Sequence, residues 1–120
     1  MIGYTTLGVK DIDAAKKFYT ELFDANVLVD VDRLAMIGNT KSQPMISVCV
    51  PYNEQDPHPG NGVMVAFPGG SREGADALYN KAIELGATCE GAPGSRIEGQ
   101  YYGGYVKDAD GNKLCFYDFS

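Results

Sequence analysis

The same order of predicted elements occurs twice in this 120-residue chain, at an offset of about 60 residues. In each half, a strand leads into an amphipathic helix, and three further strands follow the helix. Neither half is large enough to bury a stable core alone. The repeat therefore predicts an α+β fold of paired βαβββ modules, the first at about 1–53 and the second at about 61–120, within a single domain spanning 1–120.

The first half opens with an alternating strand at Gly3–Val9, which leads directly into a helix. Asp11 is a good N-cap for that helix, because its carboxylate can accept from the free amides of the first turn. The apolar stripe of the helix ends at Phe23. The strands expected after it are 27–31, 34–37 and 45–51. The loop 52–61 follows, since its prolines and its Gly-Asn end are incompatible with regular structure.

The second half repeats this order. A strand at 62–67 precedes a helix that Ser71 caps and that Gly86 ends. The glycine-rich segment 91–99 is expected to be a loop. The turn 108–112 joins the last two strands as a hairpin. The strands expected after the helix are 88–90, 101–107 and 113–119.

The composition is that of an ordinary globular protein, with 44% hydrophobic and 22% charged residues. We expect no secretory leader and no membrane association, because no basic leader and no apolar run of spanning length occurs. The net charge of −6 argues against nucleic acid as a partner and is compatible with a cationic ligand. The three cysteines lack CxxC spacing, which favours reduced thiols and predicts a cytoplasmic location.

Two motifs stand near the ends of the chain. Residues 9–19 read Val-Lys-Asp-Ile-Asp-Ala-Ala-Lys-Lys-Phe-Tyr, and residues 106–114 read Val-Lys-Asp-Ala-Asp-Gly-Asn-Lys-Leu. The first resembles the strand-to-helix start of the vicinal-oxygen-chelate superfamily, which includes glyoxalase I, the bleomycin-resistance proteins and the extradiol dioxygenases. The second resembles its Asp-Pro-Asp-Gly-Asn hairpin, with Ala109 where proline is common. The helix end Leu-Gly-Ala at 85–87 also fits.

This resemblance covers essentially the whole chain. It implies the glyoxalase/bleomycin resistance/dihydroxybiphenyl dioxygenase fold, in which paired βαβββ modules form curved mixed sheets enclosing a cleft. In small members of the superfamily a homodimer usually completes the cleft, so a homodimer is expected here.

In metal-dependent members, four positions in the cleft hold one divalent cation, usually through histidine and glutamate. The resemblance places these positions on Tyr4, Cys49, Gly62 and Cys115, with Ser47 as the alternative to Cys49 on the same face. Hard cations prefer carboxylates, and nickel, zinc and iron prefer imidazole with carboxylate. No metal cofactor is therefore expected. A soft metal held by the two thiolates with Tyr4 is the alternative.

Other side chains suit a small-molecule ligand. Arg96 could clamp a carboxylate, although a surface role is the more common one. The last two strands are rich in tyrosine, whose rings suit a planar or cationic guest. His58, the only histidine, lies between two prolines and could carry a proton to a ligand. The expected cleft residues are Tyr4, Thr6, Ser47, Cys49, Gly62, Met64, Arg96, Tyr101, Cys115 and Tyr117.

Two classes of function follow. The first is metal-independent binding of a small aromatic or cationic molecule, as in the bleomycin-resistance proteins. The alternative is a lyase or isomerase related to glyoxalase I that acts on a small carbonyl compound or its thiol conjugate, and it rests on the family resemblance alone. Metal-free acid or base chemistry through Tyr4 or His58 is a third hypothesis.

Overall fold

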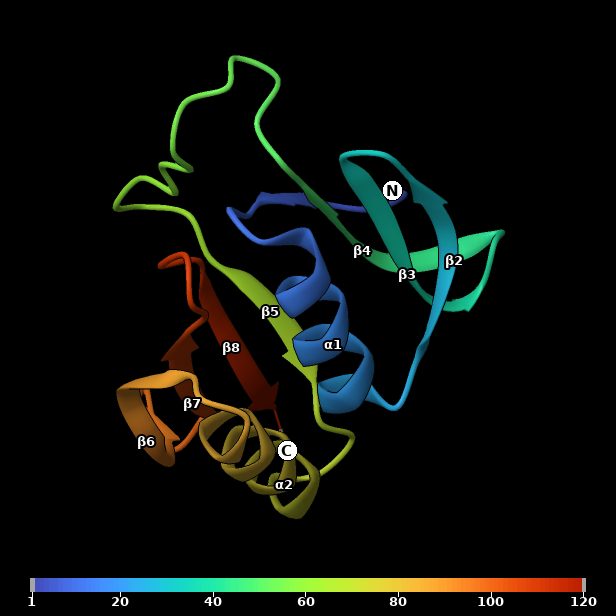
Figure 1. Cartoon of the computed structure of the whole chain (residues 1–120). Helices are drawn as coiled ribbons and strands as arrows, with labels where there is room; N and C mark the ends of the chain where they lie inside the picture. Colours follow the sequence, from blue (N-terminus) through green and yellow to red (C-terminus); the bar gives the residue numbers. More distant parts are fainter. Residues whose placement is uncertain (1, 120) are drawn as a thin grey trace. The chain divides into compact units, whose positions relative to one another are not determined.

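The computed structural model describes residues 2–119, which contain two helices and eight strands. They divide into two compact units, residues 1–59 and 60–120. Each unit consists of a four-stranded sheet with one helix on one of its faces (Figure 1). The first unit contains β1 (Thr6–Gly8), α1 (Ile12–Phe23), β2 (Asn26–Val31), β3 (Leu34–Thr40) and β4 (Gln43–Cys49). The second contains β5 (Val65–Pro68), α2 (Arg72–Glu84), β6 (Thr88–Arg96), β7 (Tyr101–Lys107) and β8 (Lys113–Asp118).

The sheet of the first unit is open and mixed, with the strand order β1-β4-β3-β2. β1 runs parallel to β4, and the other neighbours are antiparallel. The helix α1 buries Ala15, Tyr19 and Leu22. The apolar strand residues that are buried with them are Leu7, Ala35, Ile37, Ile46 and Val48. Since side chains alternate along a strand, Thr6, Ser47 and Cys49 lie on the face turned away from α1.

The sheet of the second unit has the equivalent order β5-β8-β7-β6, with β5 parallel to β8. α2 packs on the face that carries Tyr102 and Gly104. The Tyr102 hydroxyl donates to the Asp76 carboxylate of α2 at 2.5 Å. A side chain at Gly104 would come within 3.1 Å of the Tyr79 ring, so glycine allows the close approach of helix and strand. The paired βαβββ architecture predicted from the sequence is thus confirmed.

The helix termini follow the predicted capping chemistry. The Asp11 carboxylate accepts from the Ala14 amide at 3.0 Å, and the Ser71 hydroxyl accepts from the Gly74 amide at 3.0 Å. Gly86 has φ +106°, the left-handed conformation that ends a helix at little cost for glycine. Neither helix in residues 2–119 has the length and hydrophobicity needed to cross a bilayer.

The hairpin between β7 and β8 is fixed by Asp108. Its Oδ1 accepts from the amides of Asp110 and Asn112, each at 2.9 Å, and its Oδ2 accepts from Asn112 Nδ2 at 3.0 Å. Gly111 supplies a positive φ of +87°. Because β8 leaves this turn in a fixed register, Tyr105 pairs with Cys115.

The prediction of a loop at 91–99 was wrong for residues 91–96, whereas 97–99 form a turn. β6 continues to Arg96 and pairs with β7 through two register shifts, one between Cys89 and Gly91 and one between Gly91 and Gly94. β6 is an outer strand of its sheet, where Pro93 is tolerated because one side of the strand needs no ladder hydrogen bonds. Arg96 therefore sits at the end of a strand rather than in a loop.

Two predicted strands are shorter than expected. The strand predicted at 62–67 begins only at Val65, whose partner Leu114 is the second residue of β8, so β8 extends only one residue further in that direction. Gly62 and Met64 therefore precede the sheet. The strand predicted at Gly3–Val9 is confined to Thr6–Gly8, and Tyr4 lies before it with half of its surface exposed (50%).

Candidate ligand-binding site

Four of the side chains predicted to line a ligand site lie on one face of the second sheet, turned away from α2. The register pairs Arg96 with Tyr101, and Cys115 and Tyr117 follow on the adjacent β8. Tyr105 and Lys113 share this face by strand alternation. We call this surface the tyrosine face, and it consists of Arg96, Tyr101, Tyr105, Lys113, Cys115 and Tyr117.

Tyr101 lies across its own strand. A side chain at Gly103 would come within 2.9 Å of Cε2 of the Tyr101 ring, so the ring occupies the space that the glycine leaves. In this position the Tyr101 hydroxyl forms a hydrogen bond with the Cys115 thiol, with 2.9 Å between oxygen and sulfur. Cys115 is fully buried (0% exposed). Tyr101 therefore stands between the thiol and any molecule that approaches this face.

Three aromatic rings form a cluster at one end of the tyrosine face. Tyr101 and Tyr117 are stacked, with 5.9 Å between ring centroids and 13° between planes. Phe119, which follows β8, meets both rings edge-on at 5.2 Å and 5.3 Å. Phe119 remains 70% exposed. Offset stacks and edge-to-face contacts of this kind form a rigid apolar surface on which a further ring could pack.

Two cations flank Tyr105 on the same face. The Arg96 guanidinium lies 5.3 Å from the centroid of the Tyr105 ring, and the Lys113 ammonium lies 5.1 Å from it. Arg96 also donates to the Ala92 carbonyl at 2.7 Å, which folds the side chain back along β6. Both cations are thus held against the sheet beside the aromatic cluster.

Burial sets the protonation state of the Tyr101–Cys115 pair. It raises the pKa of Tyr101 well above the usual range of a phenol, and the hydrogen bond to Cys115 adds to this shift. Burial also raises the pKa of Cys115, against the opposing effects of the Tyr101 hydroxyl, Lys113 and Arg96. Both groups are consequently neutral at pH 7, so either the hydroxyl or the thiol can donate the hydrogen bond between them, and Cys115 is not a nucleophilic thiolate.

The corresponding face of the first sheet carries Thr6, Ser47 and Cys49. Ser47 is fully buried (0% exposed), and within the described residues its hydroxyl oxygen has no hydrogen-bond partner. The Cys49 thiol donates to the Val50 carbonyl at 3.2 Å. A buried hydroxyl without a partner is uncommon in proteins and marks a position where a bound group could supply the missing bond.

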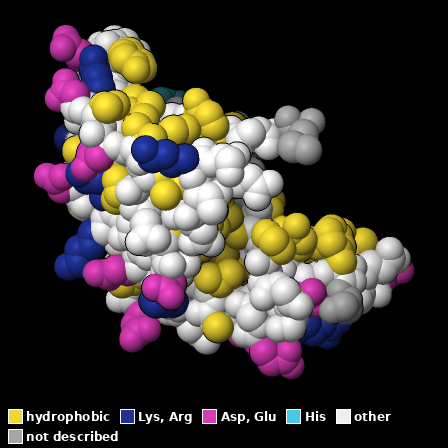
Figure 2. All heavy atoms as spheres, turned by 90° about the vertical axis from the view of Figure 1, so that its right-hand side faces the viewer, with side chains coloured by type: hydrophobic (Ala, Val, Ile, Leu, Met, Phe, Trp, Pro, Cys, Tyr) yellow, Lys and Arg dark blue, Asp and Glu magenta, His cyan; other side chains and the backbone are white. Residues whose placement is uncertain are grey.

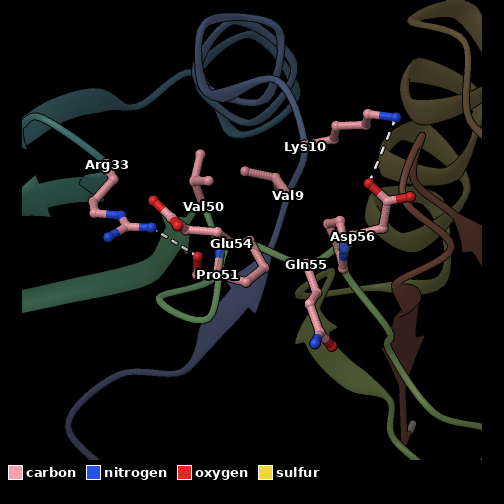
Figure 3. Close-up of a pocket in the computed structure, with 9 residues that line it drawn as sticks. Val9, Lys10, Arg33, Val50, Pro51, Glu54, Gln55 and Asp56 are labelled. Atoms are coloured by element: carbon pink, nitrogen blue, oxygen red, sulfur yellow. Dashed lines mark hydrogen bonds and ion pairs between the residues drawn. The ribbon is translucent and has the colours of Figure 1, made fainter.

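A pocket of about 260 Å³ opens elsewhere in the first unit, between the start of β3 and the segment that follows β4 (Figure 3). Arg33 donates to the Pro51 carbonyl at 2.8 Å and lies 4.9 Å from the Tyr52 ring centroid. On the opposite side, Lys10 pairs with Asp56 at 3.6 Å, and both side chains are largely exposed. Arg33 and Lys10, the cations of this pocket, already interact with other residues of the pocket, so the pocket offers little free charge to a ligand.

The ten predicted site residues thus fall into three groups. Arg96, Tyr101, Cys115 and Tyr117 lie together on the tyrosine face, whereas Thr6, Ser47 and Cys49 share a face of the first sheet. Tyr4, Gly62 and Met64 precede the strands in which they were expected. His58 is exposed in the loop.

Lys113 and Phe119 were not among the residues predicted from the sequence to line the site. The signal was present in the alternation of β8, because residues 113, 115, 117 and 119 follow one another at intervals of two. Cys115 and Tyr117 had been assigned to the site. Extending the same alternation in both directions would have added the two neighbours.

Two βαβββ units, each with the order 1-4-3-2 and a parallel pair between its first and last strands, define a class of α+β proteins. The model of the Glyoxalase/Bleomycin resistance protein/Dioxygenase superfamily matches residues 1–116. The chain therefore belongs to this superfamily.

Solved structures agree with this assignment. A glyoxalase/bleomycin resistance protein from Albidiferax ferrireducens T118 is 30% identical and superposes with a TM-score of 0.84, covering 98% of this chain and 97% of that one. A family enzyme from Burkholderia phytofirmans PsJN, 19% identical, has a TM-score of 0.81 over 98% of each chain. A glyoxalase-related enzyme from Fulvimarina pelagi, 17% identical, has a TM-score of 0.79 over 98% of this chain and 86% of that one. No curated protein matches the sequence.

The side chains at the positions expected to hold a metal do not fit a divalent cation. The Cys49 thiol is engaged by a carbonyl, and the Cys115 thiol is protonated and engaged by Tyr101. Gly62 offers no donor. Within residues 2–119, no group of three or more His, Cys, Asp or Glu side chains is placed to hold a metal ion. This donor set lacks the imidazole and carboxylate that such cations prefer.

Proposed function

We propose that this protein binds a small molecule with a flat ring on the tyrosine face, without a metal. The observation that carries the proposal is the arrangement of Tyr101, Tyr117 and Phe119, whose rings contact one another while Phe119 stays exposed. A preformed aromatic surface binds a further ring with little loss of side-chain entropy. The Tyr101 hydroxyl, neutral at pH 7, supplies a polar group beside it that can donate or accept a hydrogen bond.

The alternative, a lyase or isomerase related to glyoxalase I, needs a group that polarises a carbonyl and a base that removes a proton. On the tyrosine face, Tyr101 and Cys115 are both held in their neutral forms. The Tyr101 hydroxyl can hydrogen-bond to a bound group, but both Tyr101 and Cys115 are poor bases at neutral pH. The binding function is therefore the better supported of the two.

The test uses 2-naphthalenemethanol, an uncharged ring probe, followed by amide chemical shifts in the 15N-labelled protein. We expect shifts in β7 and β8, and about tenfold weaker binding in Tyr117→Ala, since tenfold corresponds to about 1.4 kcal/mol. The matched control is Tyr52→Ala, which removes an exposed tyrosine of the first unit. The proposal fails if no probe binds, or if both variants weaken binding equally.

A second arm tests metal independence. The purified protein is incubated with nickel, zinc or manganese, dialysed and analysed for metal content. We expect substoichiometric metal and unchanged probe affinity. One tightly held ion per chain that increases probe binding would contradict the proposal.

The homodimer and the cytoplasmic location remain predictions. Large apolar side chains are exposed in both units, including Val31 of β2 and Phe119. Figure 2 shows hydrophobic side chains at the surface between charged ones. Apolar surface of this kind is typical of ligand or partner contacts. Light scattering during size-exclusion chromatography measures the oligomeric state directly.

A further inference from the structure

We propose that the ligand of the tyrosine face is an anion, a ring that carries an oxyanion group, which Arg96 and Lys113 recognise. This inference rests on the proposed function and assigns the chemical class of the molecule. It differs from the expectation drawn from the net charge of −6, which favoured a cationic guest. Local charge, rather than the charge of the whole chain, decides what a particular surface attracts.

The charge of the tyrosine face is positive. Its two cations, Arg96 and Lys113, lie 5.3 Å and 5.1 Å from the same Tyr105 ring. Within residues 2–119, neither lies within ion-pair distance of a carboxylate. Lys107, on the same side of β7, differs because Glu90 neutralises it at 3.5 Å. The two unneutralised charges are therefore the ones available to a ligand.

The position of the Arg96 guanidinium depends on glycine. A side chain at Gly94 would come within 3.1 Å of one terminal nitrogen of Arg96, and a side chain at Gly91 within 3.4 Å of the other. The guanidinium thus occupies the space that the missing side chains of Gly91 and Gly94 leave, with one nitrogen hydrogen-bonded to the Ala92 carbonyl. An arginine held in this way keeps further N–H groups for a planar oxyanion.

The aromatic cluster and the cations are adjacent. Arg96 pairs in register with Tyr101, and the Tyr101 ring stacks on Tyr117. Lys113 is two residues from Cys115, and the Cys115 thiol is hydrogen-bonded to the Tyr101 hydroxyl. A flat ring on the cluster would accordingly bring a substituent within reach of the cations. A cationic ring in the same place would meet two like charges, which disfavours its binding.

The experiment compares four probes with the same ring: 2-naphthoate, 2-naphthyl phosphate, 2-naphthalenemethanol and 2-naphthylmethylammonium. We expect one or both oxyanions to bind at least about fivefold more tightly than the alcohol, because fivefold corresponds to about one close charge pair. The ammonium should bind most weakly of the four probes. The carboxylate and phosphate arms distinguish the two kinds of oxyanion. Among these probes, only the oxyanions should bind more weakly when the salt concentration is raised, because salt screens the attraction between exposed opposite charges.

Variants of the two cations provide the second measurement. Arg96→Gln and Lys113→Gln should each weaken oxyanion binding about fivefold, and clearly more than they weaken binding of the alcohol. Lys107→Gln is the matched control, on the same face but already paired, and should have little effect. Lys113→Glu should reverse the preference, so that the ammonium binds at least as well as the naphthoate.

The outcomes separate the two proposals. If none of the four probes binds, both the proposed function and this inference are overturned. If the ring binds equally well whatever its charge, or if neither glutamine variant affects the oxyanions, the anion preference is wrong while ring binding stands.

Discussion

The hydroxyl oxygen of Tyr101 lies 2.9 Å from the sulfur of Cys115, two residues that are 14 positions apart in the chain. Strand register alone does not bring them together, because Cys115 pairs with Tyr105. The contact exists because Gly103 leaves space for the Tyr101 ring to lie across its own strand. One missing side chain thus fixes both the hydrogen bond and the stacking of Tyr101 on Tyr117.

Tyr101→Phe removes this hydrogen bond and keeps the ring. We expect the free energy of unfolding at pH 7 to fall by about 1 kcal/mol, the usual net value of such a bond. Urea denaturation with unchanged m-value measures the difference. Tyr4→Phe removes the hydroxyl of a half-exposed tyrosine and serves as the control. Equal stability of the Tyr101→Phe variant and the original protein would show that the bond contributes nothing.

The stability should also depend on alkaline pH. The folded state raises the pKa of both Cys115 and Tyr101, so it retains protons that the unfolded chain releases once the pH passes about 8.5 for a thiol and about 10 for a phenol. The contribution of each group is complete below those values and declines as the pH rises. We therefore expect the free energy of unfolding to fall between about pH 8.5 and 11, and less steeply in Tyr101→Phe. If the free energy of unfolding falls equally steeply with pH in the original protein and in Tyr101→Phe, the Tyr101 hydroxyl does not contribute to the pH dependence.

Gly103→Ala should displace the Tyr101 ring, because the added carbon would lie 2.9 Å from Cε2 of that ring. We expect a loss of about 1–3 kcal/mol, typical of overpacking. A double-mutant cycle provides the control: in a Tyr101→Ala background the same substitution has no ring to displace and should cost much less. If the cost is equal in both backgrounds, Gly103 acts through something other than Tyr101.

Ser47→Ala tests the buried hydroxyl of the first sheet. Since this hydroxyl has no partner within the described residues, its removal should leave thermal stability unchanged or increase it by up to about 1 kcal/mol. Ser42→Ala, which removes an exposed hydroxyl near Thr40, is the reference. A clear loss of stability in Ser47→Ala alone would mean that the hydroxyl has a partner in the protein after all.

Asp108→Ala should be the most damaging of these substitutions. It removes an acceptor from two backbone amides and from the Asn112 side chain, and the two bonds to Asn112 are buried. We expect a loss of about 2–3 kcal/mol, measured by thermal unfolding, with Asp108→Asn intermediate. Lys17→Ala, at an exposed position of α1, should change stability by less than about 0.5 kcal/mol.

Local chemistry in the sequence was sufficient to predict much of the fold. Asp11, Ser71 and Gly86 act as the caps expected of them, because capping depends on residues within one turn. The strand at 101–107 was predicted with its observed bounds. The repeated order of elements then left few arrangements for two helices and eight strands.

The sequence was less informative where a strand depends on its partner. Gly91 and Pro93 are poor strand formers, yet pairing with β7 holds them in β6. Because of that error, Arg96 was predicted to lie in a loop, and its position beside Tyr105 was not recognised. The ring positions of Tyr101 and Phe119 could not be predicted either, since they follow from packing between side chains of β7 and of β8 with the residue after it. Consequently Tyr101, Tyr117 and Arg96 were assigned to the site, whereas Lys113 beside them was not.

The proline in β6 has a consequence for the behaviour of the protein at high concentration. β6 is an outer strand, and the unpaired edge of such a strand can template the addition of strands from other molecules. Pro93 lacks an amide hydrogen, and the two register shifts on either side of Gly91 bend the strand away from a regular ladder. The same irregularities that make β6 hard to recognise in the sequence thereby protect this end of the sheet from aggregation.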